Sequence, residues 1–304
     1  MDKIYKNEVG YIDLLRNTAK YGKVVTDRTG IGRKVLLSQS LSFDTHCLST
    51  IRPLPLRFAF EEMWFWLNGK TQTKELEDKG IMFWKGNTSR SFLDSRGLDY
   101  LDEGELGSAY SLAWRNSGGY DILESKKQNR SVASSGVDQL RLLVDELTHN
   151  KYSSRNVVTL YNPSEVNNGA LPPCWFGSVW NILPDENGID CLHVHLLNRS
   201  CDLLFGSQMA ISQYKILQLA LCELLGYGEG KVDTTLINAH IYLNQLDYVN
   251  ETIGRELGTQ GRITITKELN TLDDLLGMTW DDISVDGLVV NTTPFNTIRP
   301  PMAV

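Results

Sequence analysis

The strongest candidates for chemistry lie in two short stretches, residues 171–175 (LPPCW) and residues 198–202 (NRSCD). Cys174 is a candidate nucleophile, because the two prolines before it restrict the backbone and so suit a thiol that must meet a reacting atom in one geometry. Arg199 would stabilise the thiolate and bind an anion. Together with Asp202, these residues indicate a nucleophile beside an anion-binding site.

Three other interpretations stay open at this point. A lone cysteine such as Cys174 is more often a buried structural thiol. His193 and His195 share one face of a predicted strand, as metal ligands would, but no third ligand stands at a matching spacing, so we predict no metal site. Cys174 and His240 could serve as nucleophile and base of a hydrolase, although the chain lacks a glycine-flanked nucleophile turn.

Glu62 is conspicuous because it lies in an aromatic stretch, residues 56–67 (LRFAFEEMWFWL). It is either a functional carboxylate with a raised pKa or a residue that faces solvent at a helix edge. Tyr110, His240 and Tyr242 are each compatible with ordinary packing, so their chemical interest depends on their combination with the other candidates.

The elements that must position these residues follow from hydrophobic periodicity. We predict helices over 12–21, 56–67, 137–149, 212–225 and 244–255, and strands over 35–43, 156–161, 175–183, 190–197 and 234–242. Residues 27–32 form a glycine-bearing loop that would deliver Arg28 to a ligand. Residues 93–130 are predicted to be an inserted loop and lid, within one domain that spans residues 1–304.

The composition excludes several classes of protein. The chain has 304 residues, 41% of them hydrophobic, and its net charge of -7 and pI near 5.3 argue against a nucleic-acid binder. No apolar run is long enough to span a membrane, so we expect no membrane contact and a cytoplasmic location. The five cysteines include no C-x-x-C pair, and we expect them to be reduced.

An ordered set of motifs runs from residue 27 to the end of the chain. It comprises DRTG (27–30), Glu62 with FWLNG (65–69), Trp84, YSLAWR (110–115), SR (154–155), PC (173–174), RSCD (199–202), Gly206, HIY (240–242) and MAV (302–304). This set resembles thymidylate synthase and its relatives, the pyrimidine nucleotide hydroxymethylases. The resemblance implies an α+β fold whose large mixed β-sheet has flanking helices and packs sheet to sheet against a second subunit, as a homodimer.

The resemblance also implies a reaction. Cys174 would add to carbon 6 of a pyrimidine nucleoside 5′-monophosphate, which makes carbon 5 nucleophilic towards the cosubstrate 5,10-methylenetetrahydrofolate. Glu62 would organise water and proton transfers, and Tyr110 would help remove the proton on carbon 5. A soft thiolate suits this conjugate addition.

The binding residues are likewise implied by the resemblance. Arg28, Arg199 and Ser200 would hold the 5′-phosphate, with Arg155 reaching over from the partner subunit. The remaining nucleotide contacts would come from Asp202, Gln213 and the sugar-binding pair His240 and Tyr242. Folate would contact Trp84, Leu171, Asp202, Gly206, Met209, Val304 and, near its glutamate tail, Arg52.

Three positions depart from the family pattern. Asn156 replaces the second arginine of an arginine pair, and Trp175 replaces a histidine that usually follows the nucleophile. Ala210 stands where the synthases have an asparagine that reads the edge of uracil and a cytosine-specific hydroxymethylase type has an aspartate. Because an unpaired base edge costs about 1–3 kcal/mol, we expect Gln208, Gln213 or a water to replace this contact.

These departures favour a nucleotide hydroxymethylase of a modified-pyrimidine pathway, in which water adds to the transferred carbon. The alternative is a methylating thymidylate synthase, which converts dUMP to dTMP, or another methyltransferase acting on carbon 5 of a pyrimidine monophosphate. Trp84 and the MAV tail favour this alternative, because they resemble parts that keep water out. A homologue that binds nucleotide or RNA without turnover is a third hypothesis, from a different class.

Overall fold

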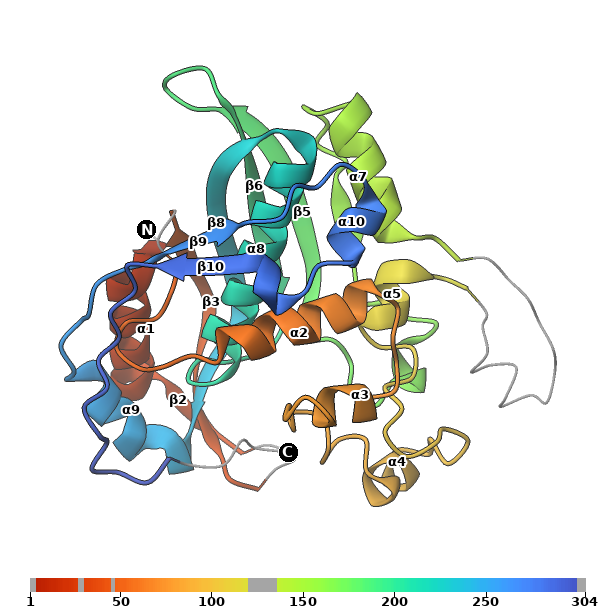
Figure 1. Cartoon of the computed structure of the whole chain (residues 1–304). Helices are drawn as coiled ribbons and strands as arrows, with labels where there is room; N and C mark the ends of the chain where they lie inside the picture. Colours follow the sequence, from red (N-terminus) through yellow and green to blue (C-terminus); the bar gives the residue numbers. More distant parts are fainter. Residues whose placement is uncertain (1–3, 27–29, 45–46, 120–135, 300–304) are drawn as a thin grey trace.

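The computed structural model describes residues 4–26, 30–44, 47–119 and 136–299. Its helices and strands (Figure 1) are β1 Ile4–Lys6, α1 Asn7–Tyr21, β2 Lys23–Val25, β3 Arg33–Phe43, α2 Leu56–Leu67, α3 Lys74–Glu77, α4 Arg90–Ser95, α5 Ser111–Arg115, α7 Gln139–His149, β4 Val157–Thr159, η1 Val166–Asn168, β5 Trp175–Pro184, β6 Asp190–Asn198, β7 Cys201–Asp202, α8 Gly206–Leu225, β8 Gly228–Tyr242, η2 Leu243–Gln245, α9 Leu246–Ile253, β9 Arg262–Ile265, α10 Leu272–Leu276, η3 Trp280–Asp282 and β10 Ile283–Asp286.

A mixed sheet of eight strands forms the centre of the described structure. Its order is β1-β3-β8-β6-β5-β4, with β2 paired to β3 and β7 paired to β8. β6 and β7 both run parallel to β8, whereas β5 is antiparallel to β6 and β3 is antiparallel to β8. The ends of β6, β7 and β8 and the start of β5 therefore come together, and most of the candidate residues lie there.

Helices α2 and α8 lie in front of the central strands (Figure 1). Alternate residues of β6 face this layer, and Leu192, Val194 and Leu196 are almost completely buried. On the opposite face of the sheet the alternate residues are only half-buried, as His193 and His195 show. The sheet thus has one fully covered face and one face that is incompletely covered within a single chain.

The α+β class with a large mixed sheet and flanking helices is confirmed. α2 has the predicted bounds, but α8 begins at Gly206 rather than at residue 212, and β8 begins at Gly228 rather than at 234. The first half of β8 is rich in glycine and charge, yet it pairs with β6, which overrides its weak strand propensity. Gly230 is needed there, since a Cβ would lie 2.3 Å from the Leu192 carbonyl oxygen.

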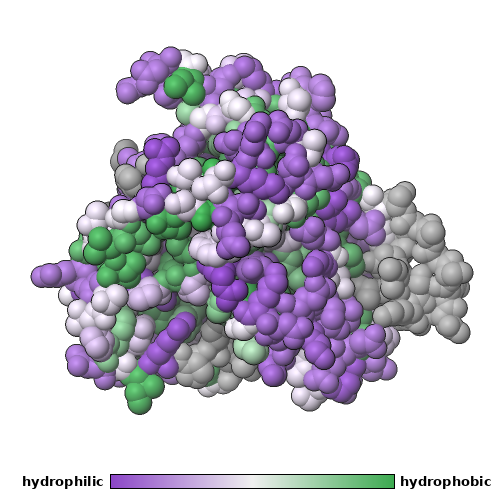
Figure 2. Space-filling view, in the orientation of Figure 1, coloured by the Kyte–Doolittle hydropathy of each residue, from purple (hydrophilic) through white to green (hydrophobic). Residues whose placement is uncertain are grey.

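The segment predicted as a loop and lid is described only up to residue 119. There it contains the end of α4, the short α5 and turns, and the surface over α3 and α4 is strongly hydrophilic (Figure 2). Its role as a lid, and the single domain over residues 1–304, remain predictions. In the described part of the chain, no helix is both long enough and apolar enough to cross a membrane.

Candidate active site

Cys174 lies just before β5, half-buried, and Arg199 holds it from the end of β6. The Arg199 guanidinium donates from Nε to the Pro173 carbonyl oxygen at 2.9 Å and from Nη2 to the Pro172 carbonyl oxygen at 2.7 Å. Nη2 also lies 3.8 Å from the Cys174 sulfur. A guanidinium at this distance would stabilise a thiolate, as the predicted role of Cys174 as a nucleophile requires.

Tyr110 connects this thiol to the aromatic side chains of the site. Its hydroxyl accepts a hydrogen bond from the Cys174 backbone N–H at 3.1 Å, and its ring stacks on Trp66 with centroids 4.5 Å apart. Its backbone has φ 45° and ψ -79°, a strained conformation that costs of order 1–3 kcal/mol. Burial, and then the charge of Cys174, raises the pKa of Tyr110 well above 10, so the hydroxyl stays protonated.

Glu62 projects from α2 into the buried region behind Tyr110. Trp84 Nε1 donates to its Oε1 and Gln213 Nε2 donates to its Oε2, both at 2.6 Å. Burial raises the pKa of Glu62 to about 7, although both hydrogen bonds oppose this shift. Glu62 is therefore not a solvent-facing residue at a helix edge, and a carboxyl with this pKa can both accept and donate a proton at neutral pH.

Asp202 is held in place rather than presented freely. Its Oδ1 accepts from the backbone N–H groups of Leu204 at 2.9 Å and Phe205 at 3.3 Å, and its Oδ2 accepts from Gln245 Nε2 at 2.8 Å. Burial raises the pKa of Asp202 against these three bonds. Gln245 also accepts from the Tyr242 N–H through its Oε1, so one fully buried amide joins the ends of β7 and β8.

His240 and Tyr242 lie at the end of β8, where His240 pairs with Asp202 in the sheet register. Their rings meet edge to face with centroids 5.2 Å apart, and His240 Nδ1 lies 3.1 Å from Asn238 Oδ1. Ser200 stands half-buried between Arg199 and β7. The structure thus gathers the proposed sugar-binding pair and two of the proposed phosphate-binding residues, Arg199 and Ser200, at one end of the sheet.

Arg155 lies far from the candidate active site of its own chain. It is exposed before β4, and Asn156 beside it accepts from the Trp180 N–H in the middle of β5. Cys174 lies just before the first residue of β5. Arg155 and Cys174 are therefore roughly 20 Å apart along the strand. Arg28 and Val304 lie outside the described residues.

The residues expected to contact folate surround Asp202. Trp84 is tied to Glu62, Leu171 and Met209 are half-buried, and a Cβ at Gly206 would meet no atom within 4 Å. Gly206 therefore borders open space at the start of α8.

Arg52 is buried beside this space. Its Nη2 donates to the Leu204 carbonyl oxygen, while its Nε has no hydrogen-bond partner among the described residues. It lines a cavity of about 300 Å³ together with Arg255 and Arg299. None of the described residues lining that cavity is acidic, so the cavity suits a carboxylate-bearing ligand.

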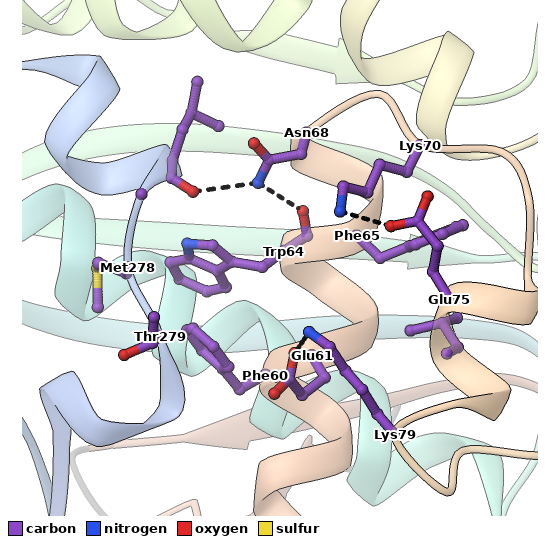
Figure 3. Close-up of a pocket in the computed structure, with 13 residues that line it drawn as sticks. Phe60, Glu61, Trp64, Phe65, Asn68, Lys70, Glu75, Lys79, Met278 and Thr279 are labelled. Atoms are coloured by element: carbon purple, nitrogen blue, oxygen red, sulfur yellow. Dashed lines mark hydrogen bonds and ion pairs between the residues drawn. The ribbon is translucent and has the colours of Figure 1, made fainter.

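A second cavity, of about 270 Å³, lies on another face of α2 than the one that carries Glu62 (Figure 3). Phe60, Trp64 and Phe65 line it from α2, and two ion pairs, Lys70 with Glu75 and Lys79 with Glu61, close its rim. Because Cys174, Glu62 and Tyr110 do not line it, this cavity is separate from the candidate active site.

His193 and His195 do not form a metal site in the structure. His195 Nε2 lies 2.8 Å from Thr235 Oγ1, and His193 Nδ1 accepts from the Lys231 N–H. In the described parts of the chain, no three His, Cys, Asp or Glu side chains are placed to hold a metal ion.

Two functional candidates were missed from the sequence. No sequence pattern pointed to Gln245 as a functional residue, because it lies in a short turn after β8. Asn198 continues the buried row of β6 and is 1% exposed, and neither of its amide atoms has a partner among the described residues. Leaving such groups unpaired costs about 1–3 kcal/mol. The signal for Asn198 was a polar residue that ends an otherwise apolar alternating strand.

The two candidates predicted to replace the missing base contact have different surroundings. Gln213 uses its amide nitrogen on Glu62, as described above. Gln208 is 1% exposed, and its Oε1 has no hydrogen-bond partner in the part of the chain that the structure describes. Ala210 is buried between them on α8.

The fold thus brings a half-buried thiol beside an arginine at the end of a mixed sheet, and it holds a buried carboxyl with a raised pKa under the helices that cover that sheet. Comparison with known proteins identifies the family. A family model described as thymidylate synthase matches residues 9–304. The chain therefore belongs to the thymidylate synthase family.

Individual relatives agree with this assignment. The chain is 30% identical to thymidylate synthase of Saccharomyces cerevisiae, over 90% of this chain and 92% of that protein. It is 29% identical to thymidylate synthase of Homo sapiens, over 98% of this chain and 91% of that protein. It is 31% identical to the bifunctional dihydrofolate reductase-thymidylate synthase of Leishmania major, over 97% of this chain but only 55% of that longer protein.

Proposed function

We propose that this protein transfers a one-carbon unit from 5,10-methylenetetrahydrofolate to carbon 5 of a pyrimidine nucleoside 5′-monophosphate and delivers it as a methyl group, as in the conversion of dUMP to dTMP. The observation that carries the proposal is the Cys174 thiol held by Arg199 and Tyr110, within a chain of the thymidylate synthase family. The names of the relatives support methyl transfer better than the hydroxymethyl transfer favoured by the sequence.

In the first step the Cys174 sulfur forms a bond to carbon 6 of the ring, and the electron pair of the ring double bond moves towards carbon 5. Arg199 favours this step because it stabilises the thiolate before attack. Carbon 5 would then bond the one-carbon unit that the folate supplies and would lose its proton, and the bond between that unit and the folate nitrogen would break. Addition of hydride to the transferred carbon would return the electron pair to the ring double bond and release the Cys174 thiolate from carbon 6.

Glu62 is the group that we assign to proton transfer. Its pKa of about 7 leaves both protonation states populated at neutral pH. Tyr110 has a different part, because its raised pKa makes the hydroxyl a hydrogen-bond donor rather than a base. We assign it to fixing Cys174 and to positioning the group or water that takes the proton from carbon 5.

The nucleotide phosphate would be held by arginines from both subunits of a homodimer. Arg199 is anchored near Cys174, and Arg28 belongs to the loop that the sequence predicts to reach a ligand. Arg155 is too far along β5 to reach its own Cys174, which supports a contribution from Arg155 of the partner subunit. The half-buried face of the sheet, where His195 and the 42% exposed Ile237 lie, is the surface that we assign to the dimer.

The residues present fit a folate cosubstrate. The cavity lined by Arg52, Arg255 and Arg299 would take the glutamate carboxylates, and the open space at Gly206 would admit the rest of the molecule. Trp84 would border the folate on the side of Glu62 and help keep water from the transferred carbon. When bound, the folate supplies the one-carbon unit and, for a methyl product, the hydride that completes it, so that the tetrahydrofolate is oxidised to dihydrofolate.

Hydroxymethyl transfer is a second candidate, in which water instead of hydride adds to the transferred carbon and tetrahydrofolate is released unoxidised. Ala210 and Asn156 favour it, because Ala210 lacks the amide and Asn156 lacks the positive charge that the methylating family pattern has at these positions. The two candidates differ by the oxidation state of the released folate.

One experiment tests both candidates. The protein is incubated with 5,10-methylenetetrahydrofolate and, separately, with dUMP, dCMP, UMP and CMP carrying tritium on carbon 5. We expect tritium release from at least one nucleotide, a product with one added methyl group by mass, and absorbance of dihydrofolate. A hydroxymethyl product without dihydrofolate would instead establish the second candidate.

The covalent step has its own test. In a 5-fluoropyrimidine nucleotide, a fluorine replaces the hydrogen that must leave carbon 5 as a proton. Incubated with 5,10-methylenetetrahydrofolate, such a nucleotide should therefore stay bonded to Cys174, and denaturation should not release it. Cys174→Ser should form no adduct. Absence of an adduct with the unchanged protein, for all four fluorinated nucleotides, would contradict the proposed function.

A further inference from the structure

Asn198 is a buried amide whose side chain makes no hydrogen bond to the described residues. It follows the apolar residues Leu192, Val194 and Leu196 in the row of β6 that faces the helices. Both of its amide atoms lack partners among the described residues. A buried polar group of this kind calls for an explanation, such as a catalytic role or a bound group.

The position of Asn198 places it at the candidate active site. It pairs across the sheet with Trp175, the residue directly after Cys174. The next residue, Arg199, donates its backbone N–H to the Cys174 carbonyl oxygen at 2.9 Å. Asn198 also shares the helix-covered face of the sheet with the hydrogen bond between Glu62 and Gln213.

The other candidates for a base contact are less suitable. Gln213 has committed its amide nitrogen to Glu62, so one half of its carboxamide is already used. Gln208 precedes Ala210 by two residues, about 200° around α8, and so faces away from the side that Ala210 presents. Asn198, by contrast, has both its donor and its acceptor unpaired among the residues that the structure describes.

We propose that the Asn198 carboxamide binds the pyrimidine edge formed by N3 and the substituent on carbon 4, and so takes over the recognition that Ala210 cannot provide. The inference rests on the proposed function, since it names the base contact of the same site. A carboxamide has one acceptor and two donor hydrogens. It can therefore accept from N3–H and donate to O4 of uracil, or, rotated by 180°, accept from the amino group and donate to N3 of cytosine.

This recognition predicts the effect of a carboxylate at position 198. An amide that rotates fits either base, whereas a carboxylate only accepts hydrogen bonds. Asn198→Asp could still accept from N3–H of uracil or from the amino group of cytosine, but its second oxygen would face another acceptor, O4 of uracil or N3 of cytosine. The substitution is therefore expected to weaken the recognition of both bases.

The test measures kcat/KM for tritium release from dUMP, dCMP, UMP and CMP. Asn198→Leu keeps the approximate volume and removes both polar atoms, and we expect kcat/KM to fall by about 10- to 100-fold. Asn198→Asp is expected to lower kcat/KM for both bases by about 10-fold or more. Thr18→Val, which removes another buried unpartnered oxygen in α1, should leave kcat/KM unchanged.

A stability measurement distinguishes recognition from a structural role. Without nucleotide, Asn198→Leu should unfold at the same urea concentration as the unchanged protein or a higher one, because no internal hydrogen bond is lost. Unchanged kcat/KM in both Asn198 variants would overturn the inference while leaving the proposed function intact. No tritium release from any nucleotide by the unchanged protein would instead contradict the proposed function itself.

Discussion

Glu61 and Glu62 are neighbours on α2, yet they belong to two different regions of the molecule. Glu61 lies at the rim of the cavity in Figure 3, where Lys79 Nζ lies 2.5 Å from its Oε2 and Arg57 Nη1 lies 4.0 Å from its Oε1. Glu62 lies in the candidate active site, where Trp84 and Gln213 are its partners. Both carboxylates are hydrogen-bonded, so the number of bonds does not distinguish them.

The difference lies in the charge of the partners. The partners of Glu61 are cations, which suits a structural ion pair. The indole and amide beside Glu62 satisfy its oxygens without supplying positive charge, so burial dominates and raises its pKa to about 7. A carboxyl prepared for proton transfer is therefore recognised by neutral donors in a buried setting, not by strong ion pairing.

The largest effect is expected from replacing the two glutamates in turn. Glu62→Gln removes the titrating group, and we expect turnover to fall by about 10²- to 10⁴-fold. Glu61→Gln should change turnover by less than twofold, because it alters only the rim of the other cavity. Tritium release from carbon 5 measures both variants. Equal losses in the two variants would show that the distinction is unfounded.

A second prediction concerns stability as a function of pH. The folded-state pKa of Glu62, about 7, lies above its usual value of 4.5, so ionisation destabilises the folded state as pH rises through this range. The stability of Glu62→Gln relative to the unchanged protein should therefore increase by up to about 3 kcal/mol between pH 4 and pH 8. Urea unfolding at both pH values measures this. A stability difference that stays constant between the two pH values would contradict this prediction.

A smaller effect is expected from the neutral donors. Gln213→Leu removes a hydrogen bond that lowers the pKa of Glu62, so this pKa should rise by about one pH unit. The acidic limb of the pH profile of kcat/KM should move to higher pH by the same amount. A profile that falls in height without moving would mean that Gln213 acts on the substrate and not through Glu62.

The smallest effect is expected at the ion pair. Lys79 is half-exposed, so its bond to Glu61 is weakened by solvent, and Lys79→Met should cost less than about 1 kcal/mol. Turnover should stay unchanged. Denaturant titration and tritium release check the two expectations. A large loss of turnover would connect the cavity of Figure 3 to the reaction.

Local sequence patterns predicted the elements that have strong periodicity. α2 was predicted with its observed bounds, because its apolar run ends at Asn68-Gly69. The starts of α8 and β8 were each placed six residues too late. In both cases polar residues begin the element, and their helical or strand conformation depends on neighbours that are distant in the sequence.

The sequence by itself determined the family, the order of the elements and the residue types available for chemistry, because motifs and periodicity are written in the order of side chains. It could not determine which of two adjacent glutamates is buried beside neutral donors, or that Asn198 is buried without a hydrogen-bond partner among the described residues. Those properties depend on burial and on partners such as Trp84 and Gln213, which join α2 only after the chain has folded. Tertiary structure decides them because desolvation and hydrogen bonding depend on three-dimensional neighbours.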